Sequence, residues 1–151
     1  MNDKKEYIPH PYELFGVECH KGWYDLLTPI FDYVKEYNKD KEEDKQIIFL
    51  QIKEKWGHLD ISVNFGTREL FDLIEKAEEE SYNVCEECGS REDVGMRETG
   101  WMTTMCLDCL KKEVKERDYP QLWRKNSDNN FYWVNPDGTV VEDTEFKNHF
   151  T

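Results

Sequence analysis

Long apolar runs are missing from this sequence of 151 residues, and no stretch approaches the roughly 18 consecutive apolar residues of a transmembrane helix. Basic residues are scarce, with 20 Lys and Arg against 33 Asp and Glu, which gives a formal net charge of −13. Such a charge repels nucleic acid and anionic membranes at long range and favours basic partners. Because the first residues lack the apolar segment of a secretory signal, we expect a cytoplasmic protein with reduced cysteines.

Motifs of the common enzyme classes are also missing. The four histidines are far apart, and none stands in an H-x-x-x-H or H-x-E arrangement. The chain has no glycine-rich phosphate loop and no G-x-S-x-G nucleophile motif. The sequence therefore favours a non-enzymatic protein.

Cysteine is the residue whose pattern is informative. Two C-x-x-C pairs, Cys85 with Cys88 and Cys106 with Cys109, are separated by 17 residues, which is typical of a two-knuckle zinc site. Each pair can place two sulfurs on one side of a tight turn, and two turns complete a tetrahedron of thiolates. Four protein ligands leave no position for water, so the Zn²⁺ is predicted to be structural. The fifth cysteine, Cys19, is expected to be a partly buried thiol and not a ligand.

The residues around these pairs predict the type of zinc site. Residues 93–105 form two strand-like arms about a Glu98-Thr99-Gly100 turn, and residues 110–117 are good helix formers. A knuckle, a hairpin and a helix that opens at the second pair are typical of a treble clef.

Upstream, the periodicity predicts two helices and a hairpin. Residues 22–38 have helical spacing, and either Thr28 caps a helix that starts at Pro29 or the helix begins at Trp23 and bends. Residues 46–65 predict an antiparallel hairpin that turns at residues 56–58. A helix capped by Thr67 follows. Its predicted inner stripe is Leu70, Phe71, Ile74, Ala77 and Ser81, and the predicted apolar face of the second strand is Leu59, Ile61, Val63 and Phe65.

The complete chain is predicted to be an α+β protein in which helices pack on an antiparallel sheet beside a treble-clef-like zinc module. Residues 1–84 form the α+β body with an N-terminal arm, residues 85–118 the zinc module, and residues 119–151 a C-terminal segment. In that segment residues 121–123 pack back and residues 131–142 form a hairpin around Asn-Pro-Asp-Gly. We expect the three parts to pack as one compact unit.

Three stretches of the sequence together resemble small uncharacterised proteins of bacteria and their phages. They are Gly22-Trp23-Tyr24-Asp25-Leu26, then Gln51-Ile52-Lys53-Glu54-Lys55-Trp56-Gly57, and the cysteine pairs with Gly100-Trp101 and Thr104 before the second pair. The resemblance spans residues 12–112. It implies a zinc-binding α+β protein of the kind carried on mobile elements, and it implies no established activity.

These observations favour a zinc-stabilised protein-interaction module with a basic protein partner. A phage inhibitor that acts on a host defence or nucleic-acid-binding protein through an acidic surface is one such role. The carboxylates expected to form that surface are Glu42, Glu43, Asp44, Glu78, Glu79 and Glu80.

Two alternatives use other residues. Nucleic acid could bind the zinc helix through Lys111, Lys112 and Lys115, with Trp101 as a stacking face, although interleaved carboxylates are typical of an ordinary solvated helix. A small molecule such as a nucleotide could bind a pocket of aromatic residues. The residues expected to line that pocket are Trp23, Tyr24, Trp56 and Trp101.

Overall fold

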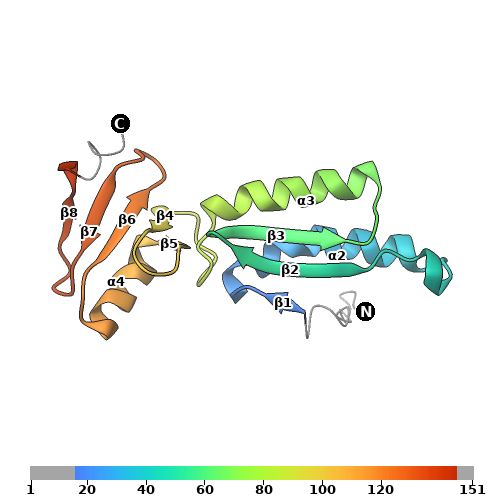
Figure 1. Ribbon diagram of the computed structural model, residues 1–151, viewed down its shortest axis with the longest axis horizontal. Helices are drawn as coiled ribbons and strands as arrows, with labels where there is room; N and C mark the ends of the chain where they lie inside the picture. Colours follow the sequence, from blue (N-terminus) through green and yellow to red (C-terminus); the bar gives the residue numbers. More distant parts are fainter. Residues whose placement is uncertain (1–15, 146–151) are drawn as a thin grey trace, which may run out of the picture.

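Two sheets lie end to end in the computed structural model, which describes residues 16–145 (Figure 1). Residues 16–84, here called the body, contain a three-stranded sheet with helices α2 (Tyr24–Asn38) and α3 (Arg68–Glu80). Residues 85–145, here called the cysteine unit, contain a five-stranded sheet and helix α4 (Leu107–Arg117). The predicted α+β class is confirmed. None of the described helices is long and apolar enough to cross a membrane.

A hairpin forms the centre of the body sheet. Strands β2 (Phe49–Lys55) and β3 (His58–Val63) pair antiparallel, with Ile52 opposite Ile61. The two turn residues, Trp56 and Gly57, both have positive φ angles, 54° and 87°, as a two-residue type I′ turn requires. The predicted hairpin is thus confirmed. Strand β1 (Val17–Glu18) adds to β2 in parallel, and residues 1–15 of the predicted N-terminal arm lie outside the described residues.

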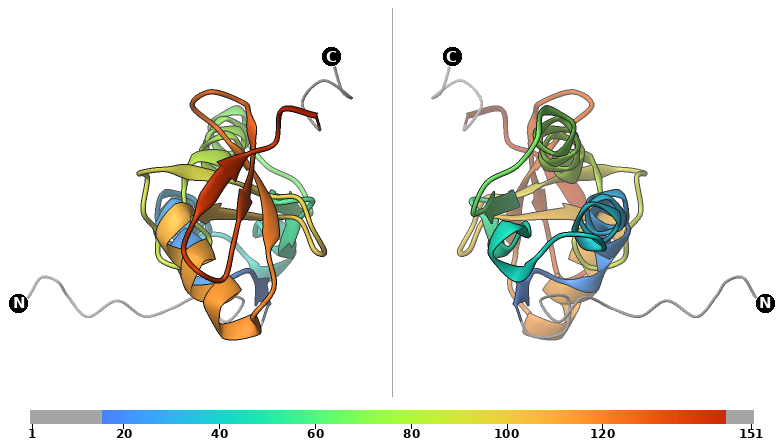
Figure 2. Two further views of the ribbon diagram at one scale, coloured as in Figure 1. Left: turned by 90° about the vertical axis from the view of Figure 1, so that its left-hand side faces the viewer. Right: turned by 90° about the vertical axis from the view of Figure 1, so that its right-hand side faces the viewer.

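Both helices of the body cover the same face of this sheet (Figure 2). A short 3₁₀ turn, η1 (Lys21–Trp23), leads directly into α2, so Pro29 lies inside the helix and Thr28 does not cap it. The helix therefore runs through Pro29, as the second of the two alternatives predicted, and it begins at Tyr24. Pro29 lacks an amide proton and removes one helical hydrogen bond. The core between sheet and helices includes Trp23, Leu27, Ile30, Val34, Ile52, Leu59, Ile61, Leu70 and Ile74.

The predicted cap of α3 is confirmed, because the Thr67 hydroxyl accepts a hydrogen bond from the Leu70 amide at 3.1 Å. Two side chains differ from the predicted buried stripes. Phe71 is 48% exposed, since the stripe of Leu70, Ile74 and Ala77 fixes the inner face and Phe71 lies about 100° around the helix from Leu70. Phe65 is 41% exposed because β3 ends before it, at Val63.

The cysteine unit is built on a sheet with strand order β5-β4-β6-β7-β8. The predicted hairpin of β4 (Val94–Arg97) and β5 (Thr103–Cys106) is present, as is the C-terminal hairpin of β7 (Phe131–Val134) and β8 (Val140–Glu142). Between them β6 (Gln121–Lys125), expected only to pack back, pairs with both β4 and β7. The predicted boundary at residue 119 therefore divides a continuous sheet. Helix α4 buries Leu110 and Val114 against it.

Candidate metal centre

Four thiols meet where the knuckle, strand β5 and helix α4 come together. The Sγ atoms of Cys85, Cys88, Cys106 and Cys109 all lie within 4.8 Å of one another, and those of Cys88 and Cys106 are 3.7 Å apart. Sulfurs at tetrahedral positions about 2.3 Å from a metal would be separated by about 3.8 Å. The cluster thus has the donor type and spacing to hold one metal ion, with four protein ligands and no position open to substrate.

Local backbone structure brings the thiols together. Residues 85–90 form a tight turn, in which the Cys85 amide donates to the Ser90 carbonyl and the Gly89 amide donates to the Cys85 carbonyl, both at 2.8 Å. Gly89 has a φ of 83°, a conformation that glycine adopts without a steric penalty and that lets the chain leave the turn after Cys88. Cys106 precedes α4, and its Sγ accepts the Cys109 amide at 3.4 Å. The first turn of α4 therefore fixes the spacing of the second pair.

The acidities of the thiols indicate that the cluster favours a cation. Burial raises the pKa of Cys106 to about 11. Burial also raises the pKa of Cys109, and the negative charge of Cys85 raises it further. Partial burial opposes ionisation of Cys88, but hydrogen bonds from the Ser90 backbone and the neighbouring thiols lower its pKa. Thiols this close therefore resist carrying several negative charges together. A bound metal cation would stabilise all four thiolates.

The knuckle also joins the two units at a seam. The Gly22 amide of the body donates to the Glu86 carbonyl at 2.8 Å, and the Glu86 amide donates to Thr104 of β5 at 3.0 Å. A Cβ atom on residue 22 would overlap the carbonyl oxygens of Cys85 and Glu86, so only glycine allows this close approach. Trp23, fully buried next to Gly22, donates its indole N–H to the Val84 carbonyl at 2.7 Å.

A second contact connects the two hairpins across the seam. The buried Thr104 hydroxyl donates to the Gly57 carbonyl at 2.5 Å, and the Trp101 indole donates to Glu54 Oε1 at 2.8 Å. Gly57 lies so close to the Met96 sulfur that a side chain there would overlap it. Gly22, Gly57 and the knuckle thus meet at one joint.

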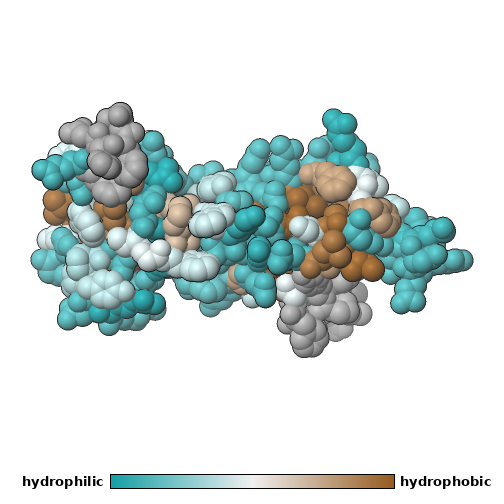
Figure 3. All heavy atoms as spheres, in the orientation of Figure 1, coloured by the Kyte–Doolittle hydropathy of each residue, from teal (hydrophilic) through white to brown (hydrophobic). Residues whose placement is uncertain are grey.

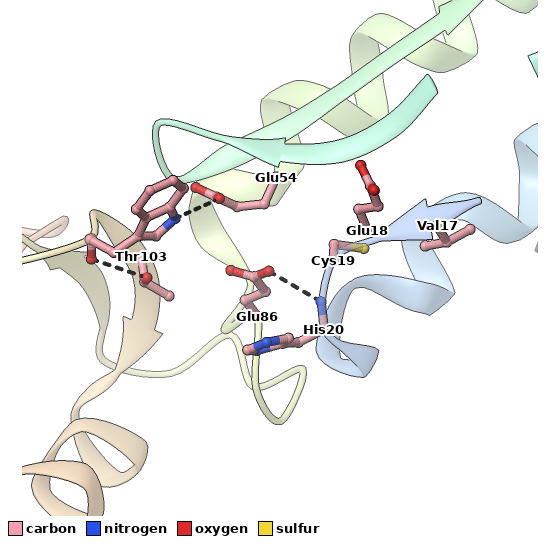
Figure 4. Close-up of a pocket in the computed structure, with 8 residues that line it drawn as sticks. Val17, Glu18, Cys19, His20, Glu54, Glu86 and Thr103 are labelled. Atoms are coloured by element: carbon pink, nitrogen blue, oxygen red, sulfur yellow. Dashed lines mark hydrogen bonds between the residues drawn. The ribbon is translucent and has the colours of Figure 1, made fainter. Parts of the chain in front are cut away.

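A pocket of about 320 Å³ opens at the seam, lined in part by Cys19, His20, Glu54, Glu86 and Thr103 (Figure 4). The Glu86 carboxylate is almost completely buried and accepts the His20 amide at 3.1 Å. Burial, followed by the charges of Glu86 and Glu54, raises the pKa of Cys19 to about 12. Cys19 is therefore a buried thiol outside the four-cysteine cluster, and His20 pairs with Glu87.

The predicted acidic residues do not form one surface. The first group, Glu42, Glu43 and Asp44, lies at or beside η2 (Glu43–Lys45), whereas Glu78, Glu79 and Glu80 lie at the opposite end of the body (Figure 1). In that second group, Glu78 accepts the Ile61 amide at 3.0 Å and Glu80 pairs with Arg91 at 3.1 Å. Glu79 is the exposed member. The chain therefore uses part of its predicted acidic surface for internal contacts.

The predicted basic face is likewise divided. The side chains of Lys111, Lys112 and Lys115 are exposed on α4, and Glu113 between them pairs with Arg97 and Arg117. The Trp101 indole bonds to Glu54 of the body and lines a groove with residues 53–56, whereas Lys112 lines a different pocket. Of the four aromatic residues expected to line one pocket, Trp56 and Trp101 share a groove, whereas Trp23 is buried in the core.

One exposed surface was not anticipated from the sequence. Ile48, Leu50, Phe65 and Phe71, here called the distal patch, are 49%, 62%, 41% and 48% exposed at the end of the body remote from the cysteines. Figure 3 shows apolar atoms gathered there, over the start of β2, the end of β3 and the start of α3. The uninterrupted apolar run of residues 47–50 is the signal for it, because a strand that is apolar at successive positions has apolar side chains on both faces.

Comparison of the chain with models of protein families, with curated proteins and with solved structures gives no match. Its function is therefore inferred from the cysteine cluster, the seam and the exposed side chains.

Proposed function

We propose that this chain is a zinc-stabilised module that binds a protein partner through the distal patch. The observation that carries the proposal is the gathering of four exposed apolar side chains at one end of the body. A contiguous exposed apolar patch is typical of an interaction site, since leaving it in water costs free energy that a partner can recover. The four-cysteine cluster supports folding at the other end of the molecule.

Zinc is the proposed metal because of the donor set. Four thiolates at tetrahedral spacing suit Zn²⁺ or an iron–sulfur cluster, and a single ion fits four sulfurs within 4.8 Å of one another. Cys85, Cys88, Cys106 and Cys109 would hold it. The ion would supply charge to stabilise the thiolates and would fix the knuckle against α4. Its role is structural because all four positions are protein ligands.

Charge defines the class of partner. The acidic segment of residues 42–44 precedes Ile48 of the distal patch with residues 45–47 between them, and all three of its carboxylates are exposed. The whole chain has a net charge of −13, which accelerates encounters with positively charged surfaces. The complementary partner surface is an apolar area bordered by Lys or Arg.

The sequence likeness to small proteins of bacteria and phages suggests the biological setting. In that setting the partner is a host nucleic-acid-binding protein, and the carboxylates beside the distal patch compete with phosphates for its basic groove. This inhibitor role predicts that binding of this chain and binding of nucleic acid exclude each other on the captured partner.

Affinity capture with matched variants tests the proposal. Leu50→Asp places a charge in the distal patch, whereas Val141→Asp places one at an apolar side chain on β8 that is 54% exposed and lies outside the patch. After nuclease treatment, a specific partner should be retained by the wild type and by Val141→Asp and lost with Leu50→Asp. Reversal of charge at Glu42 and Glu43 should weaken the same complex, and more so at low salt.

Three outcomes would contradict the proposal. Equal retention by both variants would show that the patch is not the interface, and loss of the complex with nuclease would show that nucleic acid holds it. A wild-type dimer that Leu50→Asp converts to monomer would assign the patch to a second copy of the chain. Because Leu50 is 62% exposed, its variant should melt at nearly the wild-type temperature, which separates lost binding from lost folding.

A further inference from the structure

Trp56 occupies a backbone position that tryptophan rarely takes. It is the first residue of the β2–β3 turn, with a φ of 54°, where Asn, Asp and Gly are favoured and a bulky side chain is an outlier. The conformation is costly, and Trp56 does not offset the cost by entering the core, since it is 67% exposed. A strained, exposed aromatic residue points to a use other than folding.

A second exposed tryptophan stands next to this turn on the other unit. Trp101, in the β4–β5 turn, is 71% exposed, yet its indole is held by the hydrogen bond to Glu54 Oε1. Trp56 and Trp101 line one groove of about 520 Å³, which is within the range of small-molecule sites, roughly 300–1,000 Å³. The groove is also lined by Lys53, Glu54, Lys55, Glu98, Gly100 and Met102.

The charged side chains of the groove are not equally available. Glu54 accepts hydrogen bonds with both oxygens, from Trp101 and from the Gly57 amide at 2.6 Å, and Glu98 pairs with Arg124 at 3.0 Å. Lys53 and Lys55 have no ion pair or hydrogen bond through their side chains within residues 16–145. Glu98 is therefore neutralised by Arg124, whereas Glu54 keeps its charge with both oxygens hydrogen-bonded to neutral donors. Among the described residues, the charged groups of the groove that have no partner are the two ammonium groups.

We propose that this groove binds a mononucleotide, with the base against the indoles of Trp56 and Trp101 and the phosphate beside Lys53 and Lys55. Indole faces stack on any base, and ammonium groups pair with phosphate, so the two kinds of available group match the two parts of one ligand. A free nucleotide fits better than a polymer. The groove has the volume of a single small ligand, and the net charge of −13 repels a polyanion at long range. The site is separate from the distal patch.

Calorimetric titration of the full chain with AMP, GMP, CMP and UMP tests this site. Trp56→Asn removes a stacking face and installs a residue that accepts positive φ, so binding should weaken at least about tenfold while the melting temperature stays equal or rises. Lys53→Gln combined with Lys55→Gln should reduce AMP affinity to that of adenosine, which lacks the phosphate. The matched control, Lys111→Gln with Lys112→Gln, makes the same charge change on α4 and should bind AMP as the wild type does.

The proposal is overturned if none of the four nucleotides binds at millimolar concentration, or if Trp56→Asn binds them as the wild type does. It is also overturned if a thymidine oligonucleotide binds while the mononucleotides do not, because the groove would then serve single-stranded nucleic acid. Leu50→Asp should leave nucleotide binding unchanged, so failure here and failure of the protein-binding proposal are distinguishable.

Discussion

The body and the cysteine unit carry similar charge but differ in what stabilises them. Residues 16–84 contain 16 acidic and 9 basic residues, and residues 85–145 contain 14 and 8. Among the described residues the core cluster of the body has 15 buried members, whereas that of the cysteine unit has 8, of which two are cysteines of the metal cluster. A sheet with so small a core needs another source of stability. We therefore expect the body to fold on its apolar residues and the cysteine unit to depend on the proposed metal.

Metal removal should have the largest effect, and it should be confined to one unit. Zinc binding by comparable structural sites is worth about 10 kcal/mol at neutral pH, more than the small core of the cysteine unit can replace. Chelation at neutral pH should therefore abolish hydrogen-exchange protection in β4 to β8 and preserve it in β2, β3 and α3. Peptide-resolved hydrogen exchange with mass spectrometry measures both at once.

Cys19→Ser is the control for that experiment, because Cys19 is a buried cysteine of the body outside the cluster. It should bind one zinc ion, as the wild type does, while Cys85→Ser should lose it. Equal loss of protection in both units after chelation would show that the metal stabilises the whole chain and that the comparison between the units is mistaken.

The two units also differ in how far their sequence predicts their structure. In the body the signals are local. Trp56-Gly57 defines the hairpin turn, and Thr67 caps α3 by accepting a hydrogen bond from the amide of Leu70, three residues later. The cysteine positions are local signals as well, because ligand spacing reflects turn geometry. Strand β6 is different. It is central only because it pairs with β4, far earlier in the chain, and no short-range pattern encodes that partner.

Apart from the cysteine cluster, the candidate binding surfaces were the least predictable features, for the same reason. Trp56 and Trp101 share a groove only because two separate hairpins meet at the seam, where Thr104 bonds to Gly57. The acidic groups were expected together because both are runs of carboxylates. Residues 42–44 lie at η2, however, and α3, which spans 13 residues or about 20 Å, places Glu78, Glu79 and Glu80 at the other end of the body. Charge runs indicate exposure and give no information about which runs become neighbours.

Gly22→Ala tests whether the seam couples the two units, with the next largest effect. The added Cβ would overlap the carbonyl oxygens of Cys85 and Glu86, which belong to backbone and cannot rotate away. The substitution should lower the free energy of unfolding by about 3 kcal/mol, the upper end of the usual cost of overpacking. Gly66→Ala is the control, since its Cβ would meet flexible ends of Leu70 and Phe71 and should cost less than about 1 kcal/mol. Denaturant unfolding gives the free energy of unfolding of both variants. Equal destabilisation by the two substitutions would show that the seam does not couple the units.

Glu78→Gln should produce the smallest effect. It tests whether a buried carboxylate at the edge of β3 affects the stability of the body. Strand β3 is an edge of its sheet. That edge is covered by Glu78 of α3, which accepts the Ile61 amide, and by Ser81 of the following 3₁₀ turn η3 (Ser81–Asn83), which accepts the Leu59 amide. Burial raises the pKa of Glu78 above its ordinary value of 4.5, and the charge of Asp60 also raises it, although the hydrogen bond from Ile61 lowers it. The charged carboxylate is therefore disfavoured in the folded chain.

The sign of the pH dependence follows from that raised pKa. The contribution of protonated Glu78 to stability is fully present below about pH 4.5 and is lost as the pH rises through the folded pKa, so the charged form carries a penalty at neutral pH. Glutamine keeps the acceptor for the Ile61 amide without charge, and Glu78→Gln should therefore stabilise the chain more at about pH 8 than at about pH 5. Glu79→Gln removes the same charge from an exposed position in the same turn of α3. Melting temperatures of both variants relative to wild type separate the buried carboxylate from the general effect of a negative charge at a helix C-terminus. A gain that is the same at both pH values, or shared by both variants, would mean that Glu78 contributes only surface charge and that the edge of β3 owes nothing to its burial.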